Sequence, residues 1–350
     1  MLHSRSIIAI PPGATVREQL EHRNMSQKEF AQRMDMSEKH ISHLINGKVE
    51  LTQETALRLE SVLGVPARFW NNMEALYREQ EARVLEELSI ERDEIIASKM
   101  PYSECVKLGW LQPAQKRIDK VYNLRKFFEV ANLGIIEKIP IYGIAYRTAG
   151  KSIKSDYAKA IWAQKARRDA RSVKTDSINI NLLKKSLSHI RALTTLSPDI
   201  FCKKLEDILA SCVIALVFLP HINSSLIHGA TFVDGNYIVL GLTVRGKYAD
   251  MFWFSLFHEL GHILKGHITN NFSTTEVNEK EADKFAQDTL ISYEEYSSFI
   301  NKKDFSKTEI VYFANQIGIA PGIVLGRLQK ENHIPYSWHH DLKIMYEYSE

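Results

Sequence analysis

The segment FHELGH, residues 257–262, constrains this 350-residue chain more than any other feature. His258 and His262 are four residues apart, so on a helix both side chains lie on one face, one turn apart. The residues around them are apolar, which predicts a largely buried helix. Buried ring nitrogens need partners, and two imidazoles in this arrangement can bind one zinc ion. Glu259 is placed to accept a proton from water rather than to bind the metal.

A third ligand is expected from the helix predicted in EKEADKFAQDTLI, which begins at Glu279. If this helix packs antiparallel to the first, Glu279 completes a site of two histidines and one glutamate. Asp283, on the same face, could then accept a hydrogen bond from a ligand histidine. Glu281 is the rival ligand, but it lies about 200° around the helix from Glu279, so one face cannot offer both carboxylates. Ser273 and Glu276 are expected to form a capping box ahead of this helix.

The alternative interpretation is that the histidine pair arose by chance in an ordinary helix, with Glu279 and Asp283 as surface charges. The apolar flanks and the Glu-x-x-Ala-Asp pattern favour the metal site. Catalysis would also need a donor for the negative charge that develops on a substrate oxygen. His267 is expected to be exposed just past the helix end. The sequence does not choose among four candidate donors: His228, Tyr248, His267 and Arg327.

The composition is that of a globular chain, since 45% hydrophobic and 25% charged residues exclude a disordered or fibrous one. Cys105, Cys202 and Cys212 are far apart and form no CxxC pair, which fits a reducing compartment. The apolar runs are shorter than the roughly 20 residues that span a bilayer, and no signal peptide is recognisable. These features predict a cytoplasmic protein without membrane contact.

The chain is expected to be mainly α with a small β-sheet, an α+β class, in three parts. Residues 1–79 predict an all-α helix-turn-helix domain, residues 80–200 a helical connector and middle region, and residues 201–350 an α+β domain. In the last part, CVIALVFLP, GATFVDG and NYIVLGL predict strands. The residues Asp234-Gly235-Asn236 predict a hairpin turn between the last two of these.

Residues 26–47, SQKEFAQRMDMSEKHISHLING, predict two helices joined by a short turn. Ser26 is expected to cap the first helix in a capping box with Glu29, and Ser37 to cap the second. In the second helix the inward-facing residues are Ile41, Leu44 and Ile45. This pattern is typical of a helix-turn-helix unit.

The second of these helices carries polar side chains on the face that would enter a major groove. The residues expected to contact operator DNA are Gln27, Ser37, Lys39, His40, Ser42, His43, Asn46 and Lys48. The alternative is a helical protein-interaction module. Residues 1–80 hold ten Lys or Arg residues and ten Asp or Glu residues, which weakens the electrostatic case for DNA binding.

Residues 11–70 resemble the HigA-type antitoxin branch of the phage-repressor-like helix-turn-helix family. The resemblance rests on PGATVRE, SQKEFAQRM, HISHLINGK, TALRLE and RFW. It implies a domain that binds operator DNA, usually as a homodimer.

Residues from about 201 to 330 resemble the ImmA/IrrE metallopeptidases, through VIALVFLP, HGATFVDGNYIVLGL, FWFSLFHELGHILKGH, EKEADKFA and IAPGIVLGRLQ. This resemblance implies a gluzincin-like zinc metallopeptidase domain in which His258, His262 and Glu279 bind zinc and Glu259 is the catalytic base. Asp283 stands where many relatives have Asn, in keeping with the ExxxD pattern of other gluzincins.

Together the resemblances predict a DNA-binding regulator fused to a zinc-dependent endopeptidase. Relatives of this kind typically cleave a repressor or an antitoxin, in phage, stress or toxin–antitoxin responses. The substrate would be a partner protein, the chain itself or a close paralogue. The alternative is a non-enzymatic repressor or antitoxin with a structural or sensory metal site. Structural zinc sites usually have four protein ligands, whereas the sequence offers three.

Overall fold

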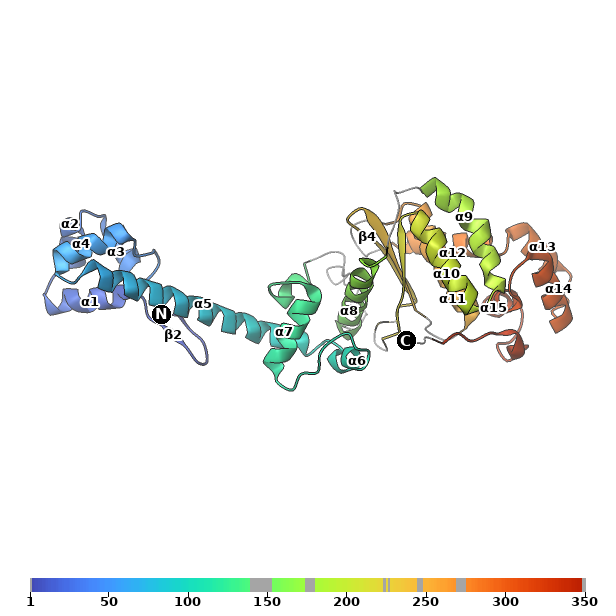
Figure 1. Ribbon diagram of the computed structural model, residues 1–350, viewed down its shortest axis with the longest axis horizontal. Coiled ribbons are helices and arrows are strands. Elements are labelled where there is room, and N and C mark those ends of the chain that lie inside the picture. Colours follow the sequence, from blue (N-terminus) through green and yellow to red (C-terminus); the bar gives the residue numbers. More distant parts are fainter. Residues whose placement is uncertain are drawn as a thin grey trace. The chain divides into compact units, whose positions relative to one another are not determined.

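The computed structural model describes residues 2–138, 153–173, 180–222, 225, 227–243, 248–268 and 275–347, with side chains from residue 156 in the second of these ranges. The chain forms two compact units, Met1–Ile95 and Ile96–Glu350. Most described residues are helical, and two small sheets complete the fold (Figure 1). This confirms the predicted α+β class.

The first unit is built from four short helices and most of a long one. They are α1 (Pro12–His22), α2 (Gln27–Arg33), α3 (Glu38–Ile45), α4 (Gln53–Leu63) and α5 (Ala67–Ala97). Three of them begin at a hydroxyl side chain that accepts a backbone N–H three residues on, at 3.1–3.2 Å. These caps, each worth about 1 kcal/mol, are Ser26 for α2, Ser37 for α3 and Thr52 for α4.

The predicted capping box at α2 is only half formed. Ser26 caps the helix as predicted, but the carboxylate of Glu29 pairs with Arg33 one turn on, at 2.7 Å. An ion pair between residues four apart on a helix is a local competitor for that carboxylate. The Ser273–Glu276 box predicted ahead of α12 (Glu276–Leu290) cannot be compared in the same way, because Ser273 lies outside the described residues; Thr275 caps that helix.

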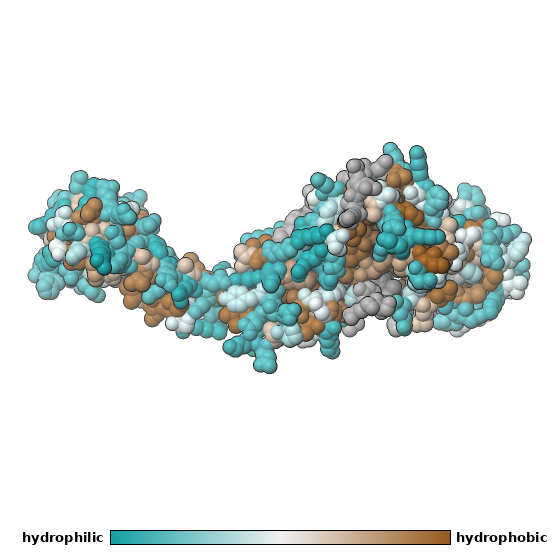
Figure 2. Space-filling model, viewed as in Figure 1, coloured by the Kyte–Doolittle hydropathy of each residue, from teal (hydrophilic) through white to brown (hydrophobic). Residues whose placement is uncertain are grey.

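The core of the first unit contains the inward face predicted for α3. Ile41, Leu44 and Ile45 are buried together with Phe30 and Trp70. Hydrophilic residues cover most of the visible face of this unit (Figure 2), as expected for amphipathic helices around one small core.

Helices α1 and α3 pack backbone to backbone. A Cβ atom on Gly13 of α1 would lie 2.3 Å from the carbonyl oxygen of Leu44 and 2.4 Å from that of Ile45. Heavy atoms of the main chain cannot rotate away from such a contact. Gly13 is therefore what lets α1 cross the end of α3.

A two-stranded sheet precedes α1, and the sequence did not predict it. β1 (Leu2–His3) pairs antiparallel with β2 (Ile8–Ala9). Ala9 is buried against Tyr77 and Val84 of α5. The hairpin therefore folds onto the long helix that follows the four short ones.

The second unit contains further helices and a three-stranded sheet. Its helices are α6 (Tyr102–Lys107), α7 (Arg117–Phe128), α8 (Ile153–Ala170), α9 (Ile180–Ala192), α10 (Pro198–Ser211), α11 (Ala249–Leu264), α12 (Glu276–Leu290), α13 (Tyr293–Asn301), α14 (Lys307–Ile317) and α15 (Pro321–Lys330). Its 3-10 turns are η1 (Leu133–Ile135), η3 (Leu193–Thr195) and η4 (His340–Leu342). Its strands are β3 (Ile214–Phe218), β4 (Gly229–Asp234) and β5 (Tyr237–Leu242).

The sheet has the order β3-β5-β4. β4 and β5 form the predicted antiparallel hairpin, with Asp234 opposite Tyr237. Between them Gly235 has a φ of 60°, a conformation that glycine adopts without strain. β3 runs parallel to β5, with Ile214 opposite Ile238. β4 is therefore an edge strand.

Both faces of the sheet are buried. Successive residues of a strand point to opposite faces: Ile214 and Leu216 pack in the core that contains α10 and α11, whereas Ala215 and Val217 pack in the core that contains α8. Figure 1 shows α8 on one side of the strands and α10 and α11 on the other. The sheet thus forms the middle layer of three.

Helix α8 gives the middle region a packing role that the sequence did not predict. Trp162 is fully buried, and its Nε1 donates to the carbonyl oxygen of Pro220 at 3.2 Å. Its ring lies against Gly241 of β5, where a Cβ atom would come within 2.6 Å. The division of the chain into three domains stays a prediction, because packing alone does not show that a segment folds by itself.

No single helix within the described ranges has the length and apolarity to cross a membrane. α14 and α15, taken together as a pair bent by 117°, meet the criteria of length and composition. Both helices contribute buried residues, such as Ile310 and Val324, to the core of the second unit.

Candidate metal centre

The centre lies where α11 and α12 pack closely against each other. α11 is buried along most of its length, as its apolar sequence predicted. Gly261 has no side chain to hold α12 away: a Cβ atom there would lie 3.2 Å from the Cα of Ala282 and 3.0 Å from the ring of Phe285. This contact brings the polar faces of the two helices within hydrogen-bond reach of each other.

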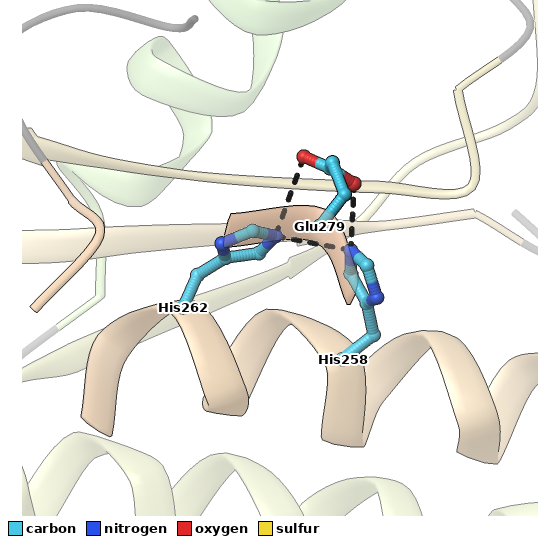
Figure 3. Close-up of side chains that lie close together, drawn as sticks. All are labelled: His258, His262 and Glu279. Carbon is cyan, nitrogen blue, oxygen red and sulfur yellow. Dashed lines mark hydrogen bonds and ion pairs between the residues drawn. The ribbon is translucent and has the colours of Figure 1, made fainter. Parts of the chain in front are cut away.

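Three candidate ligand atoms meet across the helix pair (Figure 3). Nε2 of His262 lies 3.0 Å from Nε2 of His258. The carboxylate of Glu279 lies 3.3 Å from Nε2 of His258 and 3.6 Å from Nε2 of His262. Bonds of about 2.0–2.2 Å to a tetrahedral zinc ion place ligand atoms roughly 3.3 Å apart, so the three residues fit such an ion. Among the described residues this is the one group of three that could hold a metal.

His258 is held by Asp283 from the other side of its ring. Its Nδ1 lies 2.8 Å from a carboxylate oxygen of Asp283. Because a carboxylate only accepts, Nδ1 keeps its proton and donates it, so the proton on Nε2 is the one that a metal displaces. Asp283 contacts His258, whereas Glu279, one turn earlier on α12, also reaches His262, one turn later on α11. The two helices therefore run antiparallel, which is the arrangement that the ligand prediction required. Burial lowers the pKa of His258, but the hydrogen bonds with Asp283 and Glu279 outweigh it and raise the pKa to about 10.

His262 has a partner that the sequence did not predict. Its Nδ1 lies 3.2 Å from Nδ1 of His267, whose Nε2 lies 3.0 Å from the carboxylate of Glu281. The expectation that His267 is exposed is therefore wrong, since 8% of its side chain is exposed. Glu281 stays out of the ligand group, as its position around the helix predicted. Burial and the positive charge of His258 lower the pKa of His262 to about 4.

Glu259 lies beside this group, buried between α11 and β4. The hydroxyl of Thr231 donates to its Oε2 at 2.6 Å. Gly229 leaves the space that Glu259 needs, because a Cβ atom there would lie 2.9 Å from its Cγ. Burial raises the pKa of Glu259, and the hydrogen bond from Thr231 opposes that rise. A buried carboxylate with a raised pKa is suited to act as a general base.

A cleft of about 730 Å³ opens onto these residues. Apolar side chains of α11, α12 and α15 form much of its wall. Arg327 lines the cleft but is engaged, since it donates to the carbonyl oxygen of Ile291 at 2.8 Å and to Glu331 at 3.0 Å. Tyr248 is not among the lining residues in the part of the chain that the structure describes. The candidate oxyanion donors that line the cleft are His228, His267 and Arg327.

The residues predicted to contact DNA lie on and around α3. The exposed ones are Gln27, Ser37, Lys39, Asn46 and Lys48, and the half-buried ones are His40, Ser42 and His43. His40 departs from the expected outward orientation: its Nε2 is buried and has no hydrogen-bond partner among the described residues. The contact of these eight residues with DNA stays a prediction.

Arg17 of α1 supports the end of α3, and the sequence did not single it out. It donates to Oδ1 of Asn46 at 3.1 Å, while Nδ2 of Asn46 donates to the carbonyl oxygen of Ser42 at 2.7 Å. The side chain of Asn46 is therefore fixed from two helices. No local motif signals this contact, because the two residues are 29 positions apart.

Two family models match the chain. A helix-turn-helix model matches residues 16–70, and a model of a peptidase family, described as the IrrE N-terminal-like domain, matches residues 222–328. The uncharacterized HTH-type transcriptional regulator YddM of Escherichia coli (strain K12) is 35% identical over 71 residues, which are 20% of this chain and 76% of YddM. The chain belongs to the HTH-type transcriptional regulators and carries an IrrE-like peptidase domain.

In this regulator the two matches contain the two sets of residues described above. The helix-turn-helix match includes α2, α3 and all eight predicted DNA contacts. The IrrE-like match includes the three candidate ligands as well as Glu259 and Thr231. The two matches confirm a helix-turn-helix domain of the phage-repressor-like kind and an IrrE-like peptidase domain, whereas the HigA-type branch stays a prediction. The second match supports a metallopeptidase-type activity of the regulator's C-terminal domain.

Proposed function

We propose that this regulator binds operator DNA through α2 and α3 and hydrolyses a peptide bond at the centre between α11 and α12. The observation that carries the second part is the meeting of His258, His262 and Glu279 beside the buried Glu259. Three protein ligands leave a tetrahedral zinc ion one open position, as in catalytic sites, whereas structural sites usually have four. This favours an enzyme over a purely structural or sensory metal site.

The side chains around the centre have different proposed roles in the hydrolysis. When bound, zinc supplies Lewis-acid activation of water and of the scissile carbonyl group at neutral pH. Glu259 accepts the proton of the water on Oε1, since Thr231 occupies Oε2, and passes it to the leaving amine. Asp283 keeps His258 in the tautomer whose Nε2 faces the ligand group.

Operator binding is supported by the match to helix-turn-helix proteins and by the exposed side chains of α3. Lys39 and Asn46 lie on the helix or at its end, and Lys48 follows it. In this arrangement the second helix enters the major groove, and two copies bind the two halves of a palindromic site. We therefore propose a homodimer on DNA, in which base contacts rather than net charge provide most of the specificity.

We propose that the substrate is a repressor or an antitoxin in a phage, stress or toxin–antitoxin response. An operator-binding domain would bring the peptidase to proteins bound at the same promoter. Cleavage could occur in trans, or within the chain itself or a close paralogue. We expect this to take place in the cytoplasm, where the operator DNA is.

Metal content tests the centre first. Elemental analysis of the full chain, purified without added metal, should find about one zinc ion per wild-type chain and none in His258→Ala. A wild-type chain that holds no metal, even after zinc is supplied, would overturn the peptidase and leave a DNA-binding regulator.

The Glu259→Gln variant then separates an enzyme from a non-enzymatic regulator. It should keep zinc and operator binding but lose cleavage. We would compare newly formed protein N-termini in cells that express the wild type or Glu259→Gln. Termini specific to the wild type would identify the substrate, including the chain itself. Identical sets of termini with intact gene regulation would identify a non-enzymatic regulator instead.

A further inference from the structure

Both candidate ligand histidines have their Nδ1 atoms engaged, but in different ways. His258 contacts Asp283 directly at 2.8 Å. His262 contacts His267 at 3.2 Å, and His267 in turn contacts Glu281 at 3.0 Å. The ring of His262 is therefore supported by a second arm of two residues, His267 followed by the carboxylate of Glu281. The ring of His258 is supported by a first arm of one residue, the carboxylate of Asp283.

The hydrogen bonds of the second arm have one consistent direction. If Nε2 of His262 faces a metal, its Nδ1 carries the proton and must donate. Nδ1 of His267 is then the acceptor, so the proton of the neutral His267 ring is on Nε2. Nε2 donates to Glu281, which as a carboxylate only accepts. The carboxylate thus selects the tautomer of His267, and His267 selects that of His262.

The backbone holds His267 in this place. Gly266, with a φ of 73°, ends α11 and turns the chain back. The backbone N–H of His267 donates to the carbonyl oxygen of His262 at 2.9 Å. The side chains of His262 and His267 are 7% and 8% exposed, so water competes little for their contact. Glu281, on α12, has a side chain that is 54% exposed, and it contacts His267 from the solvent side.

We propose that His267, held by Glu281, is a positioning residue of the metal centre that fixes the ring and the tautomer of His262. This rests on the proposed function, since it presumes that His262 binds zinc. Residues that orient a metal ligand in this way typically contribute 10–100-fold to metal affinity. His267 is therefore assigned to the metal ligand and not to the substrate oxygen.

Zinc affinity tests this assignment without a substrate. The full chain would compete with a fluorescent chelator for zinc. His267→Ala should weaken zinc binding about 10–100-fold. His267→Gln should restore much of the loss, because an amide oxygen can accept from His262 while the amide N–H donates to Glu281. Glu281→Gln, at an exposed position that does not endanger folding, should weaken binding several-fold.

Two further variants distinguish the positioning of His267 by Glu281 from a general effect of negative charge on α12. Glu276→Gln removes the same charge from the same helix and should leave zinc affinity unchanged. The double variant His267→Ala, Glu281→Gln should bind zinc no more weakly than His267→Ala alone, because Glu281 acts only through His267. Wild-type affinity in both His267→Ala and Glu281→Gln would overturn the assignment and leave the proposed function intact. A wild type that binds no zinc would instead defeat the proposed function itself.

Discussion

At the scale of single residues, Glu259 shows how the fold fixes a side chain from a distant segment. Thr231 binds one carboxylate oxygen, and Gly229 leaves the space that Cγ occupies. Burial favours the protonated form of a carboxyl group, and a hydrogen bond to the ionised form opposes this. β4 therefore sets both the position and the charge of the proposed base.

Replacing Thr231 by Val keeps its shape and removes this donor. The pKa of Glu259, already raised by burial, then rises further, so the base stays protonated up to a higher pH and the acidic limb of kcat/KM moves upward. At neutral pH we expect a loss of about ten- to a hundredfold in kcat/KM, because a hydrogen bond to a charged group is worth roughly 1.5–3 kcal/mol. Zinc content should not change. Thr231→Ser should behave as wild type, and identical pH profiles of kcat/KM for all three proteins would refute the role.

Residues whose roles follow from their local spacing could be predicted from the sequence. Residues that reach the centre only through the tertiary fold were missed. His258 and His262 are found from their separation of four, and Glu279 from its place on the next helix. His267 was expected to be exposed because it follows a helix end, but the turn at Gly266 returns it to the centre. Thr231 lies on a strand, and no local pattern encodes which helix that strand contacts.

At the scale of elements, the centre joins α11 to α12. Two proposed ligands come from α11 and one from α12, so a bound metal crosslinks the helix pair. Removing zinc with a chelator should lower the thermal unfolding midpoint of the second unit, since a ligand at a thousand times its dissociation constant stabilises by about 4 kcal/mol. Calorimetry of the full chain with zinc and with chelator would measure this. His258→Ala should show the lower midpoint in both conditions; an equal zinc-induced shift in that variant would place the stabilising zinc elsewhere.

The crossing of α1 and α3 should be sensitive to a single methyl group. Gly13→Ala would place Cβ within 2.4 Å of two carbonyl oxygens of α3, and such overpacking costs at least about 1–3 kcal/mol. We expect operator affinity to fall and zinc content to stay unchanged. The control is Gly64→Ala, which has a φ of 71° but nothing within 4 Å, so its cost is limited to backbone strain of about 1–2 kcal/mol. Affinity would be measured by fluorescence anisotropy on an operator selected from random DNA; a larger loss in Gly64→Ala would refute the packing argument.

Elements with a strong local signal could be predicted, and very short ones could not. α2 and α3 are visible from their capping serines, and the β4–β5 hairpin from its turn residues. β1 and β2 are two residues long, too short for any alternation to be recognised. They pair because α5 offers an apolar surface at Tyr77 and Val84, which only the folded first unit assembles.

At the scale of the whole molecule, the sheet depends on helices from both sides of it in the sequence. Strands buried on both faces are apolar throughout, as β3 is. α11 and α10 cover one face, and α8 covers the other with the buried ring of Trp162. The apolar run of β3 indicates that both faces of the sheet are buried. The sequence of a helix does not show which sheet face it packs against. The role of the middle region could therefore not be predicted.

This dependence predicts that two truncations behave differently. Removing residues 1–95 keeps α8, so the fragment 96–350 should unfold cooperatively and bind zinc with the affinity of the full chain. Removing residues 1–200 takes away α8, α9 and the first residues of α10. The loss of α8 exposes the sheet face that contains Ala215 and Val217, and a contiguous apolar surface of this kind favours aggregation. The fragment 201–350 should therefore be insoluble or lack a cooperative transition in calorimetry. A soluble 201–350 fragment with full zinc affinity would contradict this, and it would make that segment a domain of its own, with α8 as an accessory cover.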